Sequence, residues 1–193
     1  MATDVSICSN ALLMLGDKAI SSLNPPDNTD AAGMVANIYP QIRDKVLRAH
    51  PWNCAVKRVI LAPDATAPAF DYDYQFQLPS DWLRTLQVGQ RDDTVDYRME
   101  GRKILCNESV FYLKYVFQNT VESTYDSMLV HIMTLAVRAA IAYGITKSSA
   151  MATLCLQEYA AELKIAKSVD GVEEPPEQLG DERLFAAGFM SSD

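Results

Sequence analysis

The sequence predicts an α+β fold: a four-helix bundle, made of two N-terminal helices and a C-terminal helical hairpin, with an inserted small antiparallel β domain and an extended C-terminal tail. Apolar residues recur at helical spacing near both ends, short alternating stretches lie between them, and acidic residues gather at the C-terminus. The expected parts are a helical bundle domain at 1–55 and 122–168, a β domain at 56–121 and an acidic extended arm at 169–193.

Two helices are expected in the first fifty residues. Asp4 can cap a short helix that ends near Gly16, and Thr29 or Asp30 can begin a longer one. Pro40 lies inside the longer helix and predicts a kink or a restart there, because proline removes one backbone hydrogen bond. The apolar face of this helix consists of Val35, Ile38, Ile42, Val46 and Ala49.

Short stretches separated by Pro, Gly, Asn and Asp follow, and these are typical of strands. Alternation of polar and apolar residues favours an antiparallel sheet with one wetter face. Ser80 or Asp81 is expected to cap a single helical turn that Trp82 anchors. The expected strands are 56–61, 71–78, 86–88, 103–106 and 110–117.

The helical period returns after Ser123. An apolar stripe runs through residues 128–143, and a second helix is expected at 150–168. The connection between them, 147–149, is so short that the two helices must be antiparallel.

Charge and hydropathy limit the possible functions. The 193 residues carry a net charge of −8, of which −6 falls in residues 169–193, so the body is nearly neutral. This balance disfavours a DNA-binding module, which we keep as the weakest alternative. No apolar run reaches the ~18 residues of a membrane span, and residues 1–10 do not resemble a signal peptide. We therefore expect no membrane association.

The residues that carry chemistry do not form a recognisable site. The sequence lacks phosphate-binding, dinucleotide-binding, serine-hydrolase and zinc-protease motifs. His50 and His131 are interpreted as structural. The four cysteines are dispersed among apolar residues, which favours buried free thiols over metal ligands or disulfides. We predict no catalytic residue, no cofactor and no metal site.

One pair of carboxylates supports an alternative function. Asp71 and Asp73 would lie on the same face of a strand, and paired carboxylates can hydrolyse glycosidic bonds. The alternative is therefore a virion-associated polysaccharide-degrading hydrolase. A solvated strand face is the interpretation that we favour for these two residues.

Three segments together resemble a known family. Residues 38–58 resemble a helix followed by the signature PWNFA-x-K/R, residues 74–84 resemble Y-x-LP-x-D-x-LR, and residues 101–107 resemble G-x-x-I-x-[CS]-[ND]. These elements, in this order, resemble tail tubular protein A, the head-to-tail connector adaptor of podophage-type tailed phages. Cys54 stands where the signature has an aromatic residue.

The resemblance implies a structural, non-enzymatic virion protein. It implies a homo-oligomeric ring, expected to be a dodecamer, between the portal protein and the distal tail nozzle or tube, assembled in the host cytoplasm. DNA would pass through the lumen without specific binding. A nearly neutral wall suits this role, because Lys and Arg that gripped phosphates would hold the DNA back.

The acidic tail is predicted to be an interaction arm. Pro175 and Pro176 prevent the preceding helix from continuing, so the chain should leave the body extended. The tail also contains Leu179 and further apolar residues, which a solvated tether would not need. The residues predicted to bind the portal or a neighbouring subunit are Leu184, Phe185, Phe189 and Met190.

Overall fold

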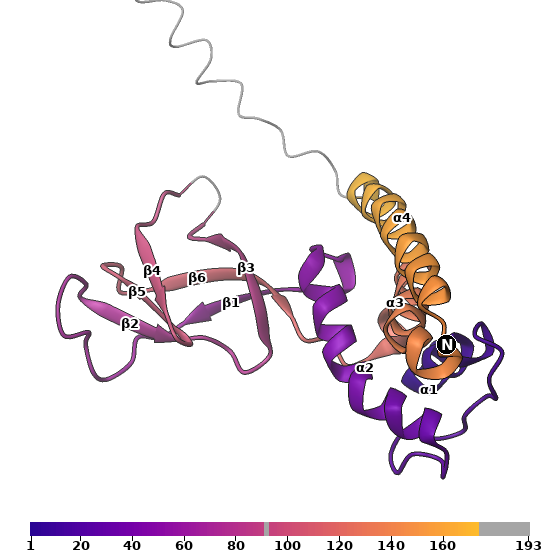
Figure 1. Cartoon of the computed structure of the whole chain (residues 1–193). Helices are drawn as coiled ribbons and strands as arrows, with labels where there is room; N and C mark the ends of the chain where they lie inside the picture. Colours follow the sequence, from indigo (N-terminus) through magenta and orange to yellow (C-terminus); the bar gives the residue numbers. More distant parts are fainter. Residues whose placement is uncertain (91–92, 174–193) are drawn as a thin grey trace, which may run out of the picture.

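The computed structural model describes residues 1–90 and 93–173. The helices are grouped at one side of the molecule and the strands at the other (Figure 1). The helices are α1 (Asp4–Leu13), α2 (Asp30–Ala49), α3 (Ser127–Thr146) and α4 (Ser149–Glu173), with short 3-10 turns at Asn53–Ala55 and Glu122–Thr124. The strands are β1 (Val56–Leu61), β2 (Tyr74–Gln77), β3 (Trp82–Val88), β4 (Tyr97–Glu100), β5 (Lys103–Cys106) and β6 (Phe111–Phe117).

Side-chain caps define where the first helices begin. Thr3, and not Asp4, is the N-cap of α1, where it forms a capping box with Ser6. Thr29 caps α2 by accepting a hydrogen bond from the amide of Ala32. Helix α2 is continuous from Asp30 to Ala49 with Pro40 inside it, so the predicted restart does not occur.

The predicted four-helix bundle is wrong. Helix α3 is the centre of the helical body: α1 and α2 pack against it, and α4 packs chiefly on α3. The helical residues are mostly C-terminal, because α3 and α4 have 20 and 25 residues whereas α1 and α2 have 10 and 20. A row of apolar residues shows that a helix is amphipathic, but it does not show how many neighbours that helix has.

The strands lie between α2 and α3 in the chain, but they form two three-stranded antiparallel sheets and not the single sheet that was expected. Their orders are β1-β6-β3 and β2-β5-β4. Phe76 of β2 and Phe111 of β6 lie with ring centroids 5.2 Å apart and belong to a second apolar core between the sheets. The molecule is therefore α+β with four helices and two sheets.

Two local predictions in the β region fail for identifiable reasons. Trp82 begins β3 and pairs with Phe117 of β6, so the expected helical turn is absent from this part of the structure. Strand β4 was not predicted; it forms a hairpin with β5 around Gly101, whose φ is +60°. Its sequence, Y-R-M-E, is short and largely exposed, so hydrophobic alternation gives little signal there.

The expectation that no apolar run is long enough to span a membrane is wrong for helix α3. It is long and apolar enough to cross a membrane by length and composition, with a mean hydropathy of 1.7 over its best window. More than half of that window, 56%, is buried inside the protein. A buried core helix passes the same test, and α3 has this position in the helical body.

Helix α4 continues to Glu173, five residues beyond the predicted end at Ser168. Asp170 lies in this extension and is buried, which explains why the helix does not end before it. The rest of the predicted extended arm, residues 174–193, lies outside the described residues.

Candidate interaction surfaces

A polar junction joins the sheet β1-β6-β3 to the turn between β4 and β5. Lys57 of β1 lies with its ammonium nitrogen 2.7 Å from Asp81 Oδ2, and the Tyr115 hydroxyl of β6 donates to Asp81 Oδ1 at 3.0 Å. Arg102 donates to the carbonyls of Pro79 and Ser80 at 2.6 and 3.2 Å. We call Lys57, Asp81, Tyr115 and Arg102 the junction; it holds β1, β3, β6 and the β4–β5 turn together.

The junction perturbs the ionisation of two of its members. Partial burial alone would raise the pKa of Asp81, but the hydrogen bonds from Lys57 and Tyr115 and the charge of Lys57 outweigh burial and lower it. Burial and the hydrogen bond to Asp81 raise the pKa of Tyr115 to about 12. Asp81 is therefore an ionised acceptor between two donors at neutral pH, and Tyr115 keeps its proton.

Helix α2 contacts β3, the strand that follows Asp81 of the junction. Arg48 donates to the carbonyl of Leu83, and its guanidinium carbon lies 5.9 Å from the centroid of the Trp82 ring. Trp52, directly after α2, is fully buried and donates to the carbonyl of Val46 at 3.0 Å. These contacts fix the angle at which the chain leaves α2 for β1.

A second polar network joins α2 to the segment that follows β6. Tyr39 donates to Glu122 Oε1 at 3.0 Å, and Arg43 lies 3.8 Å from the same carboxylate oxygen. Gln118 donates to Asp44 Oδ2 at 2.6 Å. Burial, followed by the charge of Glu122, raises the pKa of Tyr39, so this residue serves as a neutral donor.

The two histidines lie in different surroundings. His50 Nε2 lies 2.8 Å from Asp170 Oδ2 of α4, and the His50 ring packs edge-on against Trp52 with centroids 4.8 Å apart. The amide of Asn53 lies 3.5 Å from the other oxygen of Asp170. His131 is exposed on α3. The interpretation of His50 as structural fits this placement, but its partner, 120 residues away, had no signal in the sequence.

The proposed carboxylate pair does not lie on a strand. Asp71 has a left-handed φ of 69°, and β2 begins only at Tyr74. The amide of Asp73 donates to Asn107 Oδ1 at 3.0 Å. Asp71 borders a hollow of about 240 Å³ whose lining includes Phe70, Tyr72, Gln75, Glu100 and Lys103. Asp73 is not among the lining residues, so the strand-face argument for a paired active site is wrong.

The cysteines are free thiols with little access to solvent. Cys8, Cys106 and Cys155 are buried, and Cys54 is half-buried. Burial raises the pKa of Cys54 to about 11 and also raises that of Cys106. These thiols are therefore protonated at neutral pH, which disfavours their use as nucleophiles.

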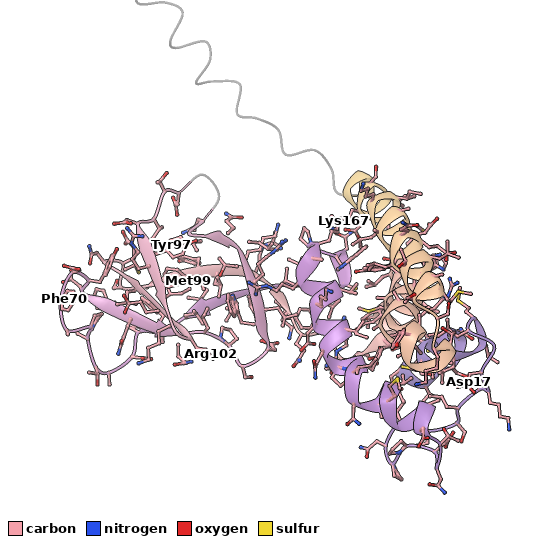
Figure 2. The ribbon with its side chains drawn as sticks, viewed as in Figure 1. Asp17, Phe70, Tyr97, Met99, Arg102 and Lys167 are labelled. Atoms are coloured by element: carbon pink, nitrogen blue, oxygen red, sulfur yellow. The ribbon has the colours of Figure 1, made fainter. Side chains whose placement is uncertain are left out.

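Two exposed apolar surfaces lie at opposite ends of the molecule. Phe70, 76% exposed, lies at the end of the β region farthest from the helices, and Met99 of β4, 40% exposed, lies nearer its middle (Figure 2). The other surface is a row on α4, which we call the outer face, formed by Met151, Leu154, Ile165 and Val169. The predicted partner-binding residues Leu184, Phe185, Phe189 and Met190 lie outside the described part of the chain.

No protein-family model matches the chain, and no curated protein matches it either.

Proposed function

We propose that this chain is a structural virion protein, the head-to-tail adaptor of a tailed phage, which forms a ring between the portal and the tail nozzle or tube. The observation that carries the proposal is the meeting of the three segments that resemble the adaptor family. Segments 38–58, 74–84 and 101–107 are separate in the sequence, yet Arg48, Lys57, Asp81 and Arg102 join them through direct contacts.

This meeting gives the segments a common mechanical role. Lys57, Asp81 and Tyr115 tie the segments together within the β region, and Arg48 of α2 donates to the carbonyl of Leu83 in β3, which attaches the sheets to the helical body (Figure 1). A subunit that must contact one partner at each end needs such a fixed connection. In the proposed ring the helical bodies pack side by side, the sheets reach the distal tail component, and DNA passes without specific binding, which the net charge of −8 favours.

The experiment is a mass measurement of the assembly. The full chain is mixed with the portal protein of the same phage, and the complex is analysed by native mass spectrometry and electron microscopy. A portal-bound ring of many copies, dodecameric in our proposal, is the expected result. A chain that stays monomeric and does not associate with the portal would refute the adaptor function. The chain without portal is the reference, because the portal can template the ring.

The alternative function, a polysaccharide-degrading hydrolase, can be tested directly. Asp71 lies beside the hollow at the end of the sheets, but Asp73 does not line it. Release of reducing sugars from host polysaccharide by the wild-type chain, lost in Asp71→Asn, would support a hydrolase. We expect no release.

A further inference from the structure

The outer face of α4 lacks free charge along most of the helix. At 100° per residue, Met151, Leu154, Ala161, Ile165 and Val169 share one side of α4, and all are exposed. Glu158 lies on the same side, with its carboxylate 2.6 Å from Arg138 of α3, and Glu162 lies at the edge of this side. From Met151 to Val169 the row is about 27 Å long at 1.5 Å per residue.

Exposure along this row is large. The exposed fractions are 54% for Leu154, 53% for Ile165 and 43% for Val169. Single exposed apolar residues are ordinary, but several on one side of a single helix are typical of an interaction surface. Helix α4 packs chiefly on α3, so the rest of the described chain does not cover the outer face.

The chain itself supplies an occupant of matching chemistry. Twenty residues follow Glu173, and they include Leu179, Leu184, Phe185, Phe189 and Met190. At about 3.3 Å per residue, residues 174–190 can reach about 56 Å, roughly twice the length of the outer face. Glu158 on the outer face is paired with Arg138 and Glu162 borders the face, so the apolar residues of this segment, and not its acidic ones, match the outer face.

The place where the chain leaves α4 favours docking of the following segment on a neighbouring copy and not on its own α4. Asp170 holds the end of α4 against His50 and Asn53, so the chain leaves from a fixed place. Pro175 and Pro176 follow almost at once, and consecutive prolines oppose the immediate reversal that packing on the same α4 requires.

We infer that residues 179–190 of one copy dock on the outer face of α4 of a neighbouring copy, with Leu184, Phe185 and Phe189 against Leu154 and Ile165. The inference rests on the proposed function insofar as that function places copies side by side. It names the partner of the C-terminal arm: a second copy of this chain.

The test is disulfide trapping between two full-length variants. Leu154→Cys protein is mixed with Phe185→Cys protein under mild oxidation, and cross-linked dimers are quantified on a non-reducing gel and identified by mass spectrometry. Leu156→Cys is the matched control, because Leu156 is 58% exposed on a different side of the same helix. Thermal melting verifies that each variant folds as the wild type does.

We expect cross-linking to position 154 to exceed that to position 156 by about tenfold or more, since burying one Leu or Phe is worth at least that factor. Equal trapping at both positions would overturn the inference. A chain that carries both Leu154→Cys and Phe185→Cys is also diluted in excess wild type. We expect no disulfide between the two cysteines of one chain. Disulfides that form only within one chain would overturn the inference. Portal association of the wild type is measured separately, so the adaptor function can stand if this docking fails.

Discussion

Asp81 connects residues from three strands through one carboxylate. It precedes β3, accepts a hydrogen bond from Tyr115 of β6 and lies 2.7 Å from the ammonium nitrogen of Lys57 on β1. Lys57 also lies 3.8 Å from the centroid of the Phe117 ring, so its charge has two partners. A carboxylate shared in this way stabilises the fold only while it is ionised.

The pKa of Asp81 in the folded state lies below its ordinary value of 3.8. Its stabilisation is therefore fully present above about pH 3.8 and is lost as the pH falls through the folded-state pKa. Asp81→Asn should lower the free energy of unfolding at neutral pH, and the difference from wild type should shrink below pH 4. Urea unfolding at several pH values measures it. Asp73→Asn, at an exposed loop position, is the control; a constant difference for Asp81→Asn would contradict the assignment.

The cysteines give a second prediction at this scale. With the pKa of Cys54 raised to about 11 and the other three side chains buried, a thiol reagent at pH 8 should label the native chain on the order of a hundredfold more slowly than a peptide thiol. In denaturant all four should react at once. Rapid labelling of Cys54 in the native chain, detected by mass spectrometry, would show that its surroundings are more open than described.

Helix α4 is anchored at two places along its length. Near its middle Glu158 pairs with Arg138 of α3, and near its C-terminal end Asp170 contacts His50 and Asn53. Asp170 is only 6% exposed, so its carboxylate depends on these partners. The last turns of α4 are thus tied to the connection between α2 and β1.

Asp170→Ala should destabilise the chain by about 1 to 3 kcal/mol, because it leaves the partly buried His50 ring without its partner. Lys164→Ala, at an exposed position six residues earlier on the same helix, should change stability by less than about 0.5 kcal/mol. Chemical denaturation of both variants measures the difference. Equal effects would show that the contact between Asp170 and His50 contributes little.

Local signals predicted the elements better than their assembly. The apolar spacing of residues 128–143 and the short connection at 147–149 are sufficient to predict α3, α4 and the turn between them. They do not show that α4 packs chiefly on α3, because an apolar row has the same spacing whether or not another helix covers it. Strand β3 was misjudged because the pairing of Trp82 with Phe117, which is distant in the sequence, decides its conformation.

The same limit applies to the candidate site. The chain segments that resemble the adaptor family were selected from local patterns, but their contacts at the junction are long-range and could not be read from any one of them. Asp71 and Asp73 illustrate the opposite error, since alternation suggested a strand where a left-handed residue breaks it. A sequence shows which residues are suited to a surface, while the fold decides which of them meet.

At the scale of the whole molecule, the chain has two separate hydrophobic cores. One lies among the helices and extends to Val116 of β6, and the other lies between the two sheets around Phe76 and Phe111. The buried residues of both cores lie between Ile7 and Ala166, and the helical and sheet bodies lie side by side (Figure 1). The residues after Glu173 are therefore expected to contribute to assembly and not to the stability of the subunit.

Deleting residues 174–193 should leave the melting temperature of the monomer nearly unchanged, since both cores remain intact. The same deletion should weaken association with the portal or the neighbouring copy. Phe185→Ala and Phe189→Ala should each weaken it by about tenfold to a hundredfold, because burying a Phe contributes about 1.5 to 3 kcal/mol whereas an exposed ion pair contributes at most about 1. Deleting only residues 191–193 is the matched control. Melting curves and sedimentation with the portal measure both effects, and a truncated monomer that melts much earlier would mean that the tail packs on its own subunit.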